Sequence, residues 1–133
     1  MALKYIYKPK LITRICFVFI LIASLCLYLY RDSAIFSSST ISSILPDFKY
    51  HISNFSISFG LVIGVGLIML LIGESLKHVL IFVLLVIVTN FIYELFLTII
   101  NTKDIIDAYY GLVGCLLAFP ILIIVKNKGL LPI

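Results

Sequence analysis

The stretch "LVIGVGLIMLLIGESLKHVLIFVLLVIVTN", residues 61–90, holds two uncharged apolar runs on either side of a short polar turn. The runs extend over about 52–73 and 79–100, and the second contains a single charged residue, Glu94. A helix crosses the hydrocarbon core of a bilayer with about 20 apolar residues, so each run is long enough to span it. Because the turn between them is short, the two helices must be antiparallel neighbours.

Composition extends this prediction to the whole chain. Of the 133 residues, 63% are hydrophobic and 12% are charged, and the mean hydropathy is +1.26, whereas soluble domains are about 45–50% apolar. Two further apolar runs cover about 11–30 and 107–125. We therefore predict one all-α membrane domain over 1–133, a four-transmembrane-helix bundle with a Ser-rich loop at 31–47. Residues 1–30 also resemble a signal peptide, but no small-residue cleavage site precedes Arg31, so we expect an uncleaved anchor.

The distribution of basic residues predicts the orientation. With the N-terminus inside, seven of the ten Lys and Arg residues lie on the cytoplasmic side: Lys4, Lys8, Lys10, Arg14, Lys77, Lys126 and Lys128. This excess favours a multi-pass protein of the cell membrane with both termini inside and the loop 31–47 outside. The net charge of +4 then reflects topology and anionic lipid, so we expect membrane lipids and no nucleic acid as partners.

Glu94 is the most informative residue of the third span. An ionisable side chain inside a span is costly, usually faces the bundle interior, and is a functional candidate. Its helical face also carries Asn90, Thr98 and Asn101, so this polar stripe is expected to look inward. Glu94 is expected to hold a proton or to pair with a cation such as Lys103, Lys49 or Arg31.

A second polar stripe precedes the second span. Its members recur at helical spacing and fall on one face if the helix begins by about residue 47: Asp47, His51, Asn54 and Ser58. At the start of the fourth span, Asp104 is expected to be the N-cap, and Asp107 is expected in the first turn. Together these side chains predict an outward-opening polar recess with candidate ligand-binding residues Glu94, Asp107, His51, Asp104, Asn90 and Asn54. The alternative is a set of hydrogen bonds that only fastens the helices.

Small residues predict where helices pack closely. Gly111 and Gly114 share a side of the fourth span, and Gly60 and Gly64 follow Ser56 at spacings of four in the second. A metal site made by His51 with Asp47, Asp104 and Asp107 is chemically feasible, but no spacing is specific to it, and we expect none. No CxxC pair, P-loop, nucleophile elbow or HExxH motif is present, so we expect no cofactor.

The segment "YELFLTIINTKDIIDAYYGLVGCLLAF", residues 93–119, resembles the signature of VanZ-like membrane proteins, with Glu94, Asp107 and Gly114 at the matching positions. The upstream "LPDFKYHISNF" is similar to the start of an earlier span in that family, where Lys49, His51 and Phe55 match. Gly111 and Leu97 stand where the family usually has Asn and Gln. The resemblance implies a small bacterial plasma-membrane protein of the cell envelope, linked through some members to glycopeptide or lipopeptide resistance.

Three functions remain open from the sequence. The first is a recess that binds an envelope lipid or a peptidoglycan precursor by its headgroup. The second is a membrane-embedded hydrolase or phosphatase that uses Glu94 or His51 as acid or base. The third is a scaffold subunit whose polar residues only join helices. The sequence predicts neither the oligomeric state nor whether the protein is an enzyme.

Overall fold

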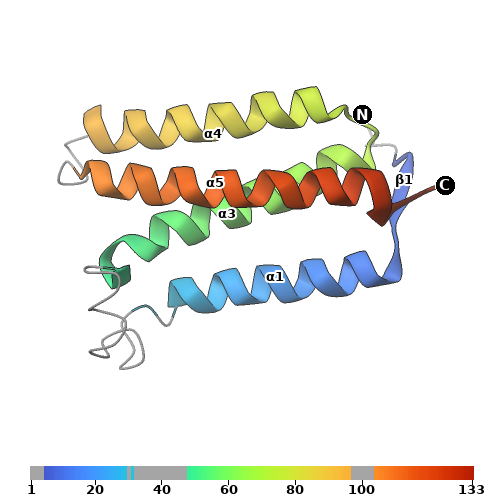
Figure 1. Cartoon of the computed structure of the whole chain (residues 1–133), viewed down its shortest axis with the longest axis horizontal. Coiled ribbons are helices and arrows are strands. Elements are labelled where there is room, and N and C mark those ends of the chain that lie inside the picture. The colour runs from blue at the N-terminus through green and yellow to red at the C-terminus, as the bar shows by residue number, and fades with distance from the viewer. Residues whose placement is uncertain (1–4, 30, 32–47, 97–103) are drawn as a thin grey trace.

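Four helices, each long and apolar enough to cross a membrane, run side by side in the part of the chain that the structure describes (Figure 1). The structure is a computed structural model and describes residues 5–29, 31, 48–96 and 104–133. The helices are α1 (Leu11–Leu29), α3 (Phe48–Leu71), α4 (Leu76–Phe96) and α5 (Ile105–Ile124), the last continued by a π-helical turn, η1 (Val125–Gly129). This confirms the predicted all-α, four-helix membrane fold.

The helix bounds differ from the predicted spans by up to four residues. The second begins at Phe48 instead of 52 and ends at Leu71, and the third begins at Leu76 instead of 79. The reason is that polar residues such as Lys49 and Lys77 occupy the first turns, where hydropathy gives no helical signal. Residues 97–100 of the third predicted span, and the predicted loop except Arg31, lie outside the described residues.

The turn between α3 and α4 is closed by local hydrogen bonds. Gly73 has a φ of 94°, a left-handed conformation that glycine adopts without a steric penalty. The N–H of Glu74 then donates to the carbonyl of Met69 at 2.9 Å, which terminates α3 in a Schellman motif. Ser75 caps α4, because its Oγ accepts from the N–H of His78 at 3.3 Å. The expected tight hairpin follows from these residues.

Helix α3 is the central element. It packs against the other three helices, most extensively against α5, while α1 makes its main contacts with α3. Figure 1 shows α3 crossing obliquely, close to α1 at one end of the bundle and close to α4 at the other. The core side chains are small or branched and come mainly from α3, α4 and α5: Val62, Ile63, Leu70, Val79, Val83, Ala118 and Leu122.

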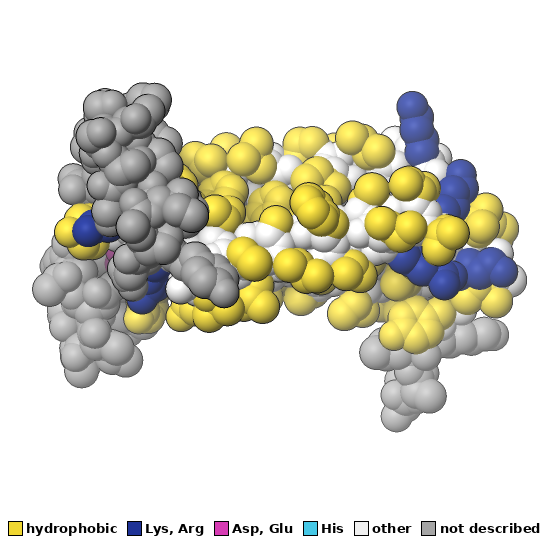
Figure 2. All heavy atoms as spheres, turned by 90° about the horizontal axis from the view of Figure 1, so that it is seen from below, with side chains coloured by type: hydrophobic (Ala, Val, Ile, Leu, Met, Phe, Trp, Pro, Cys, Tyr) yellow, Lys and Arg dark blue, Asp and Glu magenta, His cyan; other side chains and the backbone are white. Residues whose placement is uncertain are grey.

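Hydrophobic side chains also cover the outside of the bundle, as expected for a surface that meets lipid. On the face shown in Figure 2 they fill the middle of the molecule, and Lys and Arg side chains lie towards its ends. Exposed examples are Phe19, Leu85 and Leu116, which are 72%, 59% and 56% exposed. An apolar surface of this size is unfavourable in water and favourable in contact with the lipid of a bilayer.

A short ribbon joins the two ends of the chain. Strand β1 (Tyr7–Pro9) pairs antiparallel with β2 (Leu130–Pro132), and Thr13 Oγ1 in α1 donates to the carbonyl of Gly129 at 2.9 Å. The N–H of Ile6 also donates to the carbonyl of Leu71 at 2.9 Å. This ribbon was not predicted from the sequence. We call the end of the bundle that holds the ribbon and the Gly73 turn the terminal end, and the opposite end the distal end.

Glycines set the spacing of α3 and α5. A Cβ at Gly114 would lie 2.6 Å from the carbonyl oxygen of Phe55, so the two backbones are in close contact there. Gly60 faces α1, where a Cβ would lie 3.4 Å from Ser24 Oγ. At Gly64 a Cβ would meet no heavy atom of the described residues within 4 Å, so the packing role expected there is not observed.

We expect Gly114→Ala to destabilise the bundle by roughly 1–3 kcal/mol, because the added methyl group collides with the α3 backbone, which cannot move aside as a side chain can. Gly64→Ala is the matched control: the same change in open space should leave stability unchanged or raise it, since Ala favours helix more than Gly. Thermal unfolding in detergent, followed by circular dichroism, measures both. Equal midpoints for the two variants would contradict this account of the α3–α5 contact.

Candidate functional site

Polar side chains from three helices meet at the distal end and form three layers along the bundle. We call this set the polar column: His51, Asn54 and Ser58 from α3, Asn90 and Glu94 from α4, and Asp104 and Asp107 from α5. The members from α3 and from α4 are three or four residues apart, so each layer lies about one turn from the next. The structure therefore brings together all six candidate ligand-binding residues predicted from the sequence.

The first layer contains His51 and the two aspartates. His51 is only 7% exposed, and its Nδ1 lies 2.8 Å from Asp107 Oδ1 and 3.7 Å from Asp104 Oδ2. An ionised carboxylate only accepts hydrogen bonds, so the ring donates its Nδ1–H to Asp107. In the neutral imidazole the lone pair then sits on Nε2, which makes no hydrogen bond within the described part of the chain.

Helix geometry explains why both aspartates stand here. Asp104 has extended backbone angles, and its Oδ1 accepts from the N–H of Ile106 at 2.9 Å, which confirms the predicted N-cap. Asp107 lies in the first turn of α5, also as predicted, where a carboxylate favours the positive end of the helix dipole. Asp107 has a second role that the sequence suggested only in outline, because it also orients His51.

The second layer contains the buried carboxylate. Glu94 is 4% exposed, and its Oε1 accepts a hydrogen bond from Asn54 Nδ2 at 3.4 Å. The predicted inward direction of the α4 stripe is thus confirmed at Glu94. Three other members of the two predicted stripes lie outside the described residues: Asp47, Thr98 and Asn101. Lys103, one of the cations expected to pair with Glu94, also lies outside them.

The third layer depends on the absence of a side chain. Asn90 Nδ2 donates to Ser58 Oγ at 2.8 Å, and Ser58 is 2% exposed. A Cβ at Gly111 would lie 2.5 Å from Asn90 Nδ2 and 3.0 Å from Ser58 Oγ. Gly111 therefore provides the space in which these two side chains bind each other, and its predicted packing role is with side chains more than with backbone.

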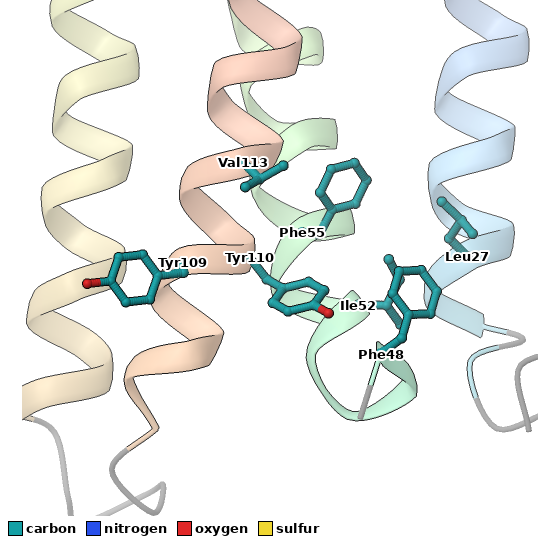
Figure 3. Close-up of a pocket in the computed structure, with 7 residues that line it drawn as sticks. All are labelled: Leu27, Phe48, Ile52, Phe55, Tyr109, Tyr110 and Val113. Atoms are coloured by element: carbon teal, nitrogen blue, oxygen red, sulfur yellow. The ribbon is translucent and has the colours of Figure 1, made fainter. Parts of the chain in front are cut away.

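An apolar cavity of about 480 Å³ adjoins the first layer (Figure 3). Its lining comes from α1, α3 and α5: Leu27, Phe48, Ile52, Phe55, Tyr109, Tyr110 and Val113. Figure 3 shows Tyr110 and Leu27 extending towards Phe48 and Ile52, whereas the ring of Tyr109 turns to the α4 side, where it packs edge-on against Phe91 at 5.7 Å.

Tyr110 lies between the cavity and the polar column and contacts both. Its ring centroid lies 5.3 Å from that of His51 and 6.2 Å from that of Phe48. One aromatic ring is thus shared by a buried polar cluster and an apolar cavity. Tyr110 was not identified from the sequence, although its position one turn after Asp107 was an available signal.

Comparisons with known protein families, curated proteins and solved structures found no match to the chain. The resemblance to VanZ-like proteins therefore stays a prediction that rests on the residues quoted for it.

The Asn90–Ser58 bond should be measurable as a coupling between α4 and α3. In a double-mutant cycle of Asn90→Ala, Ser58→Ala and the double variant, we expect a coupling energy of about 0.6–1.7 kcal/mol, the range found for hydrogen bonds between membrane helices. The free energy of unfolding is measured in mixed detergent for the wild type, the two single variants and the double variant. Additive single-variant effects would show that the two side chains do not stabilise each other. Thr89→Ala, one residue along α4 on its exposed side, is the control.

Proposed function

We propose that the distal end binds a membrane lipid of the cell envelope, with its headgroup in the polar column and an acyl chain in the adjoining cavity. The single observation that carries this proposal is the contact of Tyr110 with both parts, 5.3 Å from His51 on one side and 6.2 Å from Phe48 on the other. A polar group and an apolar chain joined in one molecule fit such a site.

The cavity itself favours a lipid over a water-soluble ligand. Its volume of about 480 Å³ lies within the range of about 300–1,000 Å³ typical of small-molecule sites, and its lining residues are apolar or aromatic. Val113, at its edge, is 47% exposed and belongs to a helix with the length and hydropathy of a membrane span. The medium that surrounds this edge in a bilayer is lipid, so an acyl chain needs no passage through water.

Two lines of support connect this site with the outer leaflet of a bacterial plasma membrane. Among the described residues, six Lys and Arg side chains belong to the terminal end, Lys8, Lys10, Arg14, Lys77, Lys126 and Lys128, and two to the distal end, Arg31 and Lys49. By the positive-inside rule the terminal end is cytoplasmic. The resemblance to VanZ-like proteins supports an envelope lipid or peptidoglycan precursor as the ligand, and a contribution to glycopeptide or lipopeptide resistance.

Cysteine labelling tests the orientation. In a background without Cys16, Cys26 and Cys115, a membrane-impermeant maleimide should label Tyr50→Cys in intact cells, because this exposed position lies at the distal end. Lys77→Cys, exposed at the terminal end, should react only after permeabilisation. The reverse pattern would place the polar column on the cytoplasmic side and exclude an outer-leaflet ligand.

A hydrolase is the second candidate, and the His51–Asp107 pair is the observation that favours it. A carboxylate bonded to Nδ1–H orients an imidazole so that Nε2 can act as a general base or nucleophile. The Asn54–Glu94 and Asn90–Ser58 bonds, in contrast, are what a scaffold without a ligand would also need. The same purified protein can distinguish these functions.

Lipid binding is tested by filling the cavity. Val113→Trp should lower the amount of lipid that copurifies with the protein, measured by native mass spectrometry, at least severalfold, because the indole occupies the volume of the chain. Val88→Trp is the matched control: Val88 is 52% exposed on α4, does not line the cavity, and should retain lipid as the wild type does. Equal retention by the two variants would contradict the proposal.

The headgroup part of the site is tested in parallel with Asp107→Asn and Glu94→Gln, which replace a carboxyl group by an amide with little change of shape. Loss of lipid with retained thermal stability supports the binding function, and matching changes in antibiotic susceptibility of the cells would connect it with resistance. Release of phosphate or headgroup from added lipid, abolished by Asp107→Asn, would favour the hydrolase. Lower stability with unchanged lipid and susceptibility would favour the scaffold.

A further inference from the structure

We propose that His51, Asp104 and Asp107 together bind one divalent transition-metal ion, with Zn²⁺ and Mn²⁺ as the best matches. Their ligand atoms all lie within 4.8 Å of one another, and the residues come from the first turns of two helices, α3 and α5. Imidazole nitrogen and carboxylate oxygen form the mixed donor set that these ions accept. No metal was expected here from the sequence, because the spacing of these residues along the chain has no metal signature.

The distances between the donor atoms suit an ion at their centre. Metal–ligand bonds of about 2.0–2.2 Å in a tetrahedral site place neighbouring donors about 3.3–3.5 Å apart. His51 Nδ1 lies 2.8 Å from Asp107 Oδ1 and 3.7 Å from Asp104 Oδ2, on either side of that value. Small side-chain rotations therefore convert the hydrogen-bonded cluster into a coordination set. The ion replaces the proton on Nδ1, as metal binding to histidine requires.

The surrounding contacts hold each donor in place. Asp104 uses Oδ1 to cap α5, so the carboxylate is fixed while its Oδ2 faces His51. The His51 ring lies against Tyr110 and is more than nine-tenths buried, which limits its rotation. Donors fixed in this way lose little conformational freedom when an ion binds, which favours affinity.

Charge gives the ion a role. Two aspartates share the cluster with one imidazole, so a bound cation would offset their negative charge and allow an anion to approach. Three protein donors leave at least one coordination position open. We infer that a phosphate oxygen of the bound lipid occupies it. This last step alone rests on the proposed function; the ion site itself does not.

Metal binding is measured on lipid-free protein in detergent, carrying a purification tag without histidine. All proteins also carry His78→Ala, because the Glu74–His78 pair at the terminal end is a second place where an ion can bind. We expect one Zn²⁺ per chain by equilibrium dialysis at about 100 µM free ion, and at least tenfold weaker binding in Asp104→Asn and in Asp107→Asn. Asp104→Asn is informative because asparagine caps a helix as well as aspartate does.

Glu74→Gln is the matched control, since it makes the same carboxylate-to-amide change at the other end of the bundle and should leave binding unchanged. Wild-type-like binding by the Asp104→Asn, Asp107→Asn double variant, or less than stoichiometric binding by the wild type, would overturn the site. A direct readout on the wild type guards against a variant that does not fold. Co²⁺ should give the strong visible absorption of a four-coordinate ion, and only the weak absorption of hydrated Co²⁺ would contradict the geometry.

Failure of this inference is distinguishable from failure of the lipid function. Lipid that stays bound after EDTA treatment, and equally in Asp104→Asn, would exclude the bridging ion and leave lipid binding intact. Stoichiometric metal binding by a protein that retains no lipid would contradict the lipid function and leave the ion site intact. If lipid is lost with EDTA and restored by Zn²⁺ or Mn²⁺ but not by Mg²⁺, the ion bridges protein and headgroup.

Discussion

The close approach of α3 and α5 at Gly114 is the contact on which the rest of the structure depends. A Cβ at position 114 would lie 2.6 Å from the carbonyl oxygen of Phe55, so this contact needs glycine. The contact fixes which residues of α3 and α5 lie opposite each other. On the distal side of this contact, Ser58 lies beside Gly111, about one turn before Gly114 in α5, and His51 lies beside Asp107, about two turns before it. In a bilayer, polar groups must find partners inside the protein. The α3–α5 contact provides them for His51 and the two aspartates, and the α3–α4 contact provides them for the Asn54–Glu94 and Asn90–Ser58 pairs.

The same register explains why a polar column and an apolar cavity can be neighbours. Residues of α3 that face α4 and α5 are polar near the distal end, whereas Phe48, Ile52 and Phe55 face α1, which packs mainly on α3. Two sides of one helix therefore line two chemically different spaces. Tyr110 joins them because α5 turns one aromatic residue towards each side, Tyr109 towards α4 and Tyr110 towards His51.

Much of the fold could be predicted from the sequence, because the signals that determine it are local. Apolar length identifies the spans, and a carboxylate before an apolar run identifies the Asp104 cap. The inward direction of Glu94 follows from the cost of exposing it to lipid. The exact pairs do not follow: periodicity places His51 and Asn54 on one face of α3, but which acid each contacts depends on the crossing of the helices.

The features that could not be predicted depend on contacts between residues far apart in the chain or on the space between helices. Gly64 has the same spacing as Gly60, yet a Cβ there would meet no heavy atom of the described residues within 4 Å. The cavity is lined by Leu27 of α1 together with α5 residues that follow it by more than 80 positions. His51, Asp104 and Asp107 were named together from the sequence, but no sequence motif predicts that their ligand atoms lie within 4.8 Å of one another, because His51 is 53 and 56 positions from the two aspartates.

The ribbon of β1 and β2 has a consequence for how the protein is made. Tyr7 pairs with Pro132, and β2 follows all four helices in the chain, so this pairing can form only after every span has been synthesised. Helix α1 enters the membrane first but is anchored to Gly129 and β2 at its terminal end. Helix α1 can pack on α3 before then, but its terminal end is fixed only when β2 has been made and pairs with β1.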